Sequence, residues 1–215
     1  MNRRFDLIIF DWDGTLINTI DWIVSCLQNA ALSCQCAIPE EQAAKNVIGL
    51  SIENAVKALF PETEWSTQKQ IIHNYSQLFF SRRLNRQDLF AGVYDMLMQL
   101  KRSGYRLAVA TGKGRAGLQQ ALKETETESL FCITRCADET ASKPNPVMLQ
   151  EILTYTKVPA GRALMVGDSV HDLQMAENAR IASIAVTCGA HGVEVLQRYK
   201  PLMCLPETSQ LLNLL

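Results

Sequence analysis

The stretch "LIIFDWDGTL", residues 7–16, joins an apolar run directly to two acids. Leu7–Phe10 are apolar and β-forming without polar alternation, which indicates a strand buried on both faces. Asp11 and Asp13 follow at once, and Gly14 allows the chain to turn sharply away. Burial of an unpaired carboxylate is costly, so acids at this point indicate a chemical role.

The composition is that of an ordinary soluble protein. The 215 residues are 47% hydrophobic and 20% charged, with a formal net charge of -1. This balance gives no support for binding to nucleic acid or to a membrane, and no segment approaches the ~18 apolar residues of a membrane span. The N-terminus lacks the apolar core of a signal peptide, so we expect a cytoplasmic protein whose seven cysteines are reduced thiols.

The chain divides into a helical block and a core. In residues 17–90 apolar side chains keep helical spacing, for example at Ile20 and Leu27, and the block is longer than the usual crossover between parallel strands. We expect it to form an inserted α-helical cap domain. Residues 1–16 and 91–215 then form one discontinuous core.

In the core, helices alternate with strands. Besides the first strand, we expect strands at 105–111, 163–168 and 183–187, and helices at 93–103, 115–123, 146–156 and 169–180. This alternation is typical of an α/β fold with a doubly wound parallel (Rossmann-like) sheet that has helices on both faces. In such sheets the active site lies beyond the carboxyl ends of the strands.

Carboxylates follow two of the expected strands. Asp11 and Asp13, two residues apart in extended chain, point the same way, and Asp168 ends the strand at 163–168. Asp172 lies in the first turn of the next helix, where the helix dipole favours a negative charge. These acids would repel one another without a cation, and an oxygen-only cluster suits Mg²⁺. We therefore expect all four acids to form a Mg²⁺ site.

Groups that suit phosphate follow other strand ends. Thr111 ends the strand at 105–111, and the amides of Gly112 to Gly114 precede a helix, a natural anion site. Lys143, in "ASKPNP", stands in extended chain just before a helix. Its charge can pair with Asp11 and neutralise a transferring phosphoryl group. We expect Thr111, Gly112 and Lys143 to hold phosphate.

The ordered set of motifs resembles the haloacid dehalogenase superfamily of phosphohydrolases. The motifs are "DWDGTL", "ATG", "SKP" and "GDSVHD", and the helical block matches the small helical cap of that family. The sequences "FAGV", "AVATGK" and "RCADETASKP" are most similar to its phosphoglycolate-phosphatase-like branch. Asn18 departs from the pattern, because relatives often carry an acid there, which concerns the cap hinge and not the chemistry.

The resemblance implies a role for each matched residue. Asp11 is the nucleophile that forms an aspartyl-phosphate intermediate, and Asp13 is the general acid and base. Thr111, Lys143 and the backbone amides near Trp12 and Gly112 hold the phosphoryl oxygens. Asp11, the Asp13 backbone carbonyl and Asp168 bind Mg²⁺, with Asp172 nearby. The position of Trp12 also suggests that its side chain lines the site.

The expected activity is thus Mg²⁺-dependent hydrolysis of a small phosphorylated metabolite, phosphoglycolate-like or a sugar phosphate. A sugar-phosphate mutase of the same superfamily carries the same motifs and remains an alternative. A non-catalytic regulatory domain is a weaker one, since it has no reason to retain Asp13. The resemblance places the cap loop Gly49-Leu50-Ser51 over the site, and we expect a monomer or weak dimer.

Two further residues near the last motif have simpler interpretations. "GDS" also begins a serine-esterase signature, but that signature normally lies near the N-terminus, with an Asp-His pair far downstream. We therefore interpret Ser169 as a helix N-cap. His171, alone on an early helical turn, is expected on the solvated surface.

Overall fold

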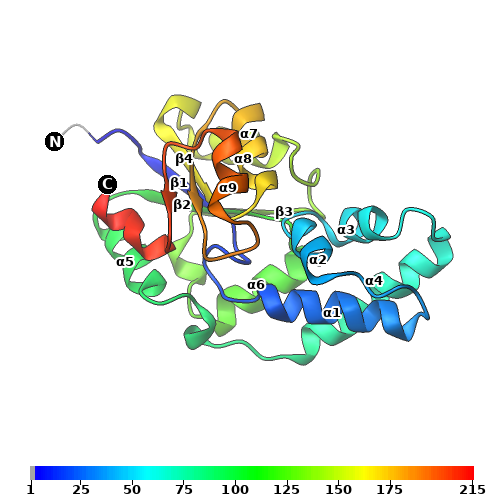
Figure 1. Ribbon diagram of the computed structural model, residues 1–215. Helices are drawn as coiled ribbons and strands as arrows, with labels where there is room; N and C mark the ends of the chain where they lie inside the picture. Colours follow the sequence, from blue (N-terminus) through cyan, green and yellow to red (C-terminus); the bar gives the residue numbers. More distant parts are fainter. Residues whose placement is uncertain (1–2) are drawn as a thin grey trace.

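The computed structural model describes residues 3–215, and its centre is a six-stranded parallel sheet (Figure 1). The strands are β1 (Leu7–Phe10), β2 (Arg106–Thr111), β3 (Ile133–Cys136), β4 (Ala163–Gly167), β5 (Ala182–Val186) and β6 (Cys204–Leu205). Their order is β3-β2-β1-β4-β5-β6, with β1 hydrogen-bonded to both β2 and β4. From β1 the chain adds strands first on one side (β2, β3) and then on the other (β4, β5, β6). Open α/β sheets bind their ligands at such a switch point.

Helices cover both faces of the sheet, as the doubly wound fold predicts. They are α5 (Val93–Arg102), α6 (Arg115–Glu124), α7 (Val147–Thr156), α8 (Val170–Asn178) and the short α9 (Val193–Leu196). α5 and α6 pack on one face, and α7 and α8 pack on the other. Within residues 3–215, none of the helices is both long and apolar enough to cross a membrane.

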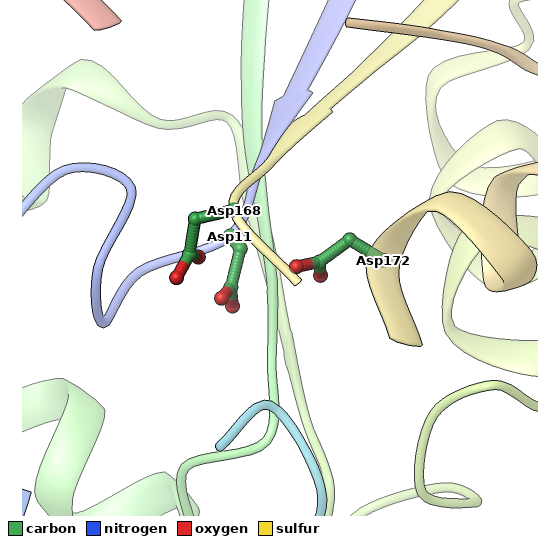
Figure 2. Close-up of side chains that lie close together, drawn as sticks. All are labelled: Asp11, Asp168 and Asp172. Carbon is green, nitrogen blue, oxygen red and sulfur yellow. The ribbon is translucent and has the colours of Figure 1, made fainter. Parts of the chain in front are cut away.

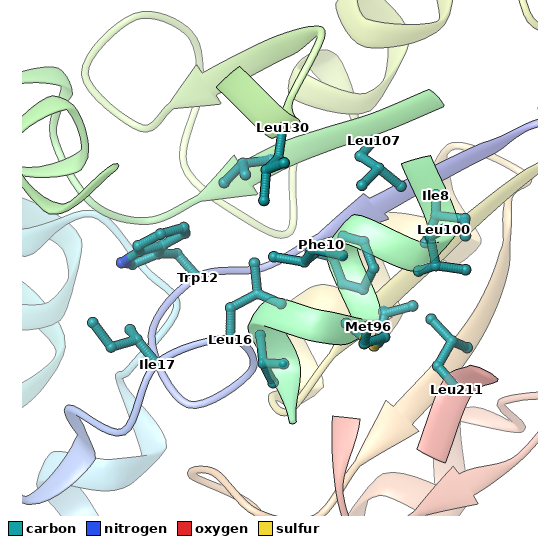
Figure 3. Packing of buried hydrophobic residues seen from close by; sticks show 14 of the residues in the cluster. Ile8, Phe10, Trp12, Leu16, Ile17, Met96, Leu100, Leu107, Leu130 and Leu211 are labelled. Carbon is teal, nitrogen blue, oxygen red and sulfur yellow. The ribbon is translucent and has the colours of Figure 1, made fainter. Parts of the chain in front are cut away.

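The side chains of β1 are buried on both faces. Ile8 and Phe10 pack with Met96 of α5, as Figure 3 shows, whereas Leu7 and Ile9 belong to the cluster on the opposite face. Complete burial of such a side chain contributes about 1.5–3 kcal/mol to stability. The apolar run before the acids therefore makes β1 a rigid support for the residues that follow it.

Residues 20–81 form four helices, which lie at one side of the sheet where the cap is expected (Figure 1). They are α1 (Ile20–Ser33), α2 (Glu41–Asn46), α3 (Ile52–Leu59) and α4 (Trp65–Ser81). These helices bury two apolar clusters, one of which also includes Ala190 of the core. The two connections to the core run side by side, because Ile17 forms an antiparallel bridge with Leu89. The boundaries at 16/17 and 90/91 stay predictions.

Two strands of the sheet were not predicted from the sequence. β3 reads "ITRC", and its two middle residues, Thr134 and Arg135, are half-exposed at the sheet edge. β6 has two residues only. Neither segment carries the continuous apolar run that identified β1, so periodicity could not separate them from loops. The predicted strands and core helices are present, with ends shifted by one or two residues.

Candidate functional site

Three carboxylates meet at the carboxyl edge of the sheet. Asp11 follows β1, Asp168 follows β4, and Asp172 lies on the first turn of α8. Three carboxylate oxygens, one from each residue, lie within 4.8 Å of one another. Figure 2 shows the three side chains pointing toward one another. All three residues are buried. The fold thus brings together acids that are up to 161 positions apart in the chain, 172 against 11.

Lys143 joins two of these acids. Its Nζ lies 2.6 Å from Asp11 Oδ1 and 2.6 Å from Asp172 Oδ1, and its side chain is fully buried. Burial by itself would lower the pKa of Lys143, but the two carboxylates raise the pKa above its ordinary value. The predicted contact between Lys143 and Asp11 is therefore present, and the lysine is a cation that also holds Asp172.

One lysine does not neutralise the cluster. Burial, together with the charges of Asp172 and Asp168, raises the pKa of Asp11 well above its ordinary value in spite of Lys143. Burial and Asp172 likewise raise the pKa of Asp168 to about 7. With all three carboxylates ionised, one ammonium would leave two negative charges in this buried site, which a divalent cation would balance. The all-oxygen donor set fits Mg²⁺.

Hydrogen bonds hold the carboxylates of Asp168 and Asp172 in place. Asp168 accepts from the Thr15 hydroxyl (2.8 Å) and from the Ala190 amide (2.7 Å). Asp172 Oδ2 accepts from both the amide (3.1 Å) and the hydroxyl (2.6 Å) of Ser169. Ser169 is the N-cap of α8, as predicted. These bonds fix the orientation of each carboxylate before any ligand binds.

Asp13 has different partners from the other acids. Its Oδ1 accepts from the Thr19 hydroxyl at 2.7 Å, and its Oδ2 lies 3.1 Å from Lys113 Nζ. The cluster of three carboxylates does not include it. The predicted metal contact of its backbone carbonyl stays a prediction. Sequence reasoning missed Lys113, and the only signal for it was its place directly after "TG" at the end of a strand.

Thr111 and Gly112 line the same cavity as Asp11 and Asp13, and their contact with phosphate stays a prediction. Thr111 is buried, and its hydroxyl accepts from the Lys113 amide at 3.1 Å. Gly112 touches the cap so closely that a Cβ there would lie 2.4 Å from the carbonyl oxygens of both Gly49 and Leu50. A glycine is needed at 112 for this approach of two backbones.

The cap and the core enclose a cavity of about 310 Å³. Asp11 and Asp13 line it together with Thr111, Gly112 and the cap loop Gly49-Leu50-Ser51. The predicted position of this loop over the site is confirmed. The Ser51 amide donates to the Ser142 hydroxyl of the core at 2.8 Å, next to Lys143, so the loop is tied to the motif that carries the lysine.

Two expectations about side chains are wrong. The Trp12 side chain does not line the cavity: it is fully buried in the hydrophobic core beside Phe131, because it alternates with Asp11 and Asp13 along extended chain (Figure 3). The phosphate contact of its backbone amide stays a prediction. His171 is half-buried and not simply solvated, since its Nε2 lies 2.9 Å from the Asn46 carbonyl oxygen of the cap.

Comparison with known proteins places this chain in a family. Residues 8–186 match the family described as haloacid dehalogenase-like hydrolase. "Probable phosphatase IndB" of Dickeya dadantii (strain 3937) is 34% identical over 213 residues, covering 96% of this chain and 92% of that protein. "Pyrophosphatase PpaX" of Bacillus cereus (strain Q1) is 28% identical, covering 99% of this chain and 97% of that protein.

Solved structures share the fold. A "predicted phosphoglycolate phosphatase" from Haemophilus somnus 129pt superposes with a TM-score of 0.86 at 23% identity, covering 100% of this chain and 99% of that chain. A hydrolase from Pseudomonas syringae superposes with a TM-score of 0.87 at 19% identity, covering 97% and 96%. With the family match over most of its length and the 34% identical relative, the chain belongs to the haloacid dehalogenase-like hydrolases.

Proposed function

We propose that the protein is a phosphatase that hydrolyses a phosphate monoester of a small metabolite through an aspartyl-phosphate on Asp11. The observation that carries the proposal is a carboxylate that lines a cavity between the cap and the core while its Oδ1 is held by the fully buried Lys143. A nucleophile mounted on a rigid strand end needs little reorganisation before it attacks. The names of the curated relatives, a phosphatase and a pyrophosphatase, support this reaction class.

In the first step, Asp11 attacks phosphorus. A bond forms between its carboxylate oxygen and phosphorus, the bond to the ester oxygen breaks, and the departing alcohol takes a proton from Asp13. Lys143 holds Asp11 in position for attack, and Thr111 and the Gly112 amide bind the phosphoryl oxygens.

In the second step, water releases the phosphate. Asp13 takes a proton from the water, the new oxygen–phosphorus bond forms, and the bond from Asp11 to phosphorus breaks. The two bonds that Asp13 makes, to Thr19 and Lys113, keep its carboxylate at the wall of the cavity near Asp11. Asp13 is thereby ready for the next cycle in its protonated form.

Asp11 and Asp168 would hold Mg²⁺, with Asp172 beside it. When bound, the ion would offset the negative charge of a phosphoryl group and balance the buried acids. Asp172 also accepts from Ser169 and contacts Lys143, so we assign it the positioning of Lys143 as well as a place in the metal site. We place the enzyme in the cytoplasm, as a monomer or weak dimer that acts on a small phosphorylated metabolite.

Removal of metal should abolish activity. Chelation of the purified protein should stop hydrolysis of p-nitrophenyl phosphate, Mg²⁺ should restore it, and Ca²⁺ should not, because Ca²⁺ prefers more ligands at longer distances. Thermal unfolding gives an independent readout: Mg²⁺ should raise the Tm of the wild type and leave that of Asp168→Asn unchanged. Full activity after exhaustive chelation would contradict the metal assignment.

Asp13→Ala should slow turnover by a factor that depends on the leaving group of the ester. Loss of a general acid and base typically costs ~10²–10⁴ in rate, and an aryl phosphate needs the acid less than an alkyl phosphate does. We expect a larger defect in rapid-quench kinetics with the alkyl ester. With the aryl ester, mass spectrometry should detect phosphorylated Asp11, because the second step still lacks its base. Asp21→Ala, which changes an exposed acid on α1, is the control. Equal defects for both esters would argue against the acid role.

A further inference from the structure

The cap side of the cavity is mostly apolar. Helices and loops of the cap contribute a set of apolar side chains, here called the cap wall: Ile23, Leu27, Val47, Ile48, Ile72 and Phe79. The cap wall faces Asp11 and Asp13, which line the same cavity from the core. The phosphate of a substrate must lie beside Asp11, so the part of the substrate that leaves must contact the cap wall.

The hydroxyl groups of the cap that line the cavity offer few contacts to a ligand. The Ser76 hydroxyl donates to the Ile72 carbonyl at 2.9 Å, and the Ser51 hydroxyl caps α3. Tyr75 stacks on Phe79, with ring centroids 5.7 Å apart. Burial and the charge of Asp13 raise the pKa of Tyr75 well above its ordinary value, so its phenol stays neutral. A sugar placed here would find on the cap mainly the hydroxyls of Tyr75 and Ser51 to replace the hydrogen bonds that it makes to water.

Positive charge is also scarce in the cavity. Lys113 is the only basic residue that lines it among residues 3–215. Its Nζ is already 3.1 Å from Asp13 Oδ2 and 4.0 Å from the centroid of the Phe79 ring. The other charged residues of the lining, such as Glu53 and Asp138 at its exposed rim, are acidic. A leaving group with a carboxylate or a second phosphate would therefore have in this cavity only Lys113, which Asp13 already contacts, to balance its charge.

We propose that the substrate is the phosphate monoester of an uncharged, largely apolar alcohol whose body packs against the cap wall. This inference rests on the proposed phosphatase activity and narrows its substrate class. The proposed substrate class excludes pyrophosphate and phosphoglycolate, because both of these ligands carry a second anionic group. Residues of the cap wall then determine specificity, and Asp11 and Asp13 perform the chemistry.

The test compares esters with different leaving groups on the purified, Mg²⁺-supplied enzyme. Benzyl phosphate is the apolar probe, and 2-phosphoglycolate, pyrophosphate and ribose 5-phosphate are the charged or polar ones. We expect kcat/KM for benzyl phosphate to exceed that for each of the others by at least tenfold. Comparable or better turnover of any of the three would overturn the inference. Failure to hydrolyse even p-nitrophenyl phosphate would instead refute the proposed function itself, and the inference with it.

A charge placed in the cap wall should change the preference. Ile72→Lys, on the cavity side of α4, should raise kcat/KM for 2-phosphoglycolate relative to benzyl phosphate by at least tenfold. Ile72→Met, the neutral control of similar size, should keep the wild-type order of substrates. An unchanged ratio in a folded Ile72→Lys protein, checked by circular dichroism, would show that the cap wall does not contact the leaving group. Should that variant fail to fold, the wild-type comparison alone decides.

Discussion

Asp11→Asn is expected to abolish turnover and to leave the fold intact. The amide keeps the size of the carboxylate but is not a nucleophile, and it removes one charge from the buried acidic cluster. Loss of a nucleophile in an enzyme that forms a covalent intermediate costs on the order of 10⁴-fold or more in kcat. The fold should persist because Lys143 keeps its second partner, Asp172, at 2.6 Å. Hydrolysis of p-nitrophenyl phosphate measures the loss, and circular dichroism measures the fold.

The matched control is Asp95→Asn, the same change at an exposed acid on α5. This variant should retain wild-type kcat and KM. A folded Asp11→Asn protein that cleaves p-nitrophenyl phosphate at a rate close to the wild type would rule out Asp11 as the nucleophile. Any residual activity of the Asp11→Asn preparation is measured again with chelator in the same assay. Activity that persists with chelator would come from a contaminating enzyme.

Lys143→Met is expected to have the largest effect on stability. The ammonium is fully buried between Asp11 and Asp172, so its removal leaves two buried carboxylates without their cation. Loss of one partner of a buried ion pair typically lowers the free energy of unfolding by ~3–5 kcal/mol. Catalysis should also be lost, because Lys143 orients the nucleophile. Urea unfolding of the metal-free protein at neutral pH measures the change.

Two further variants make this prediction specific. Lys123→Met, at an exposed position of α6, should change the free energy of unfolding by less than ~0.5 kcal/mol. The double variant Lys143→Met, Asp172→Asn should be more stable than Lys143→Met alone, since one of the two stranded charges is removed. A single variant as stable as the wild type would mean that Lys143 does not compensate these acids.

Local signals were sufficient for the core and for most of the candidate residues. The apolar run Leu7–Phe10, followed by two acids and a glycine, specifies a buried strand that ends at a site, because each of these preferences acts within a few residues. Thr111, Lys143 and Asp168 were found in the same way, as polar residues where an apolar or extended segment ends. The short strand β3 was missed because an edge strand needs no apolar run.

Which charges meet was decided only by the tertiary structure. The ion pair between Lys113 and Asp13 joins segments 100 positions apart, and no feature of "TGKG" indicates that partner. The same holds for the capture of Lys143 by two acids and for the contact of Gly112 with the cap loop. The helical spacing of the apolar residues in the cap does not show which of them face a neighbouring helix and which face the cavity. Their role depends on how the cap packs on the core, because burial and electrostatic coupling are properties of distances in space and not of positions in the chain.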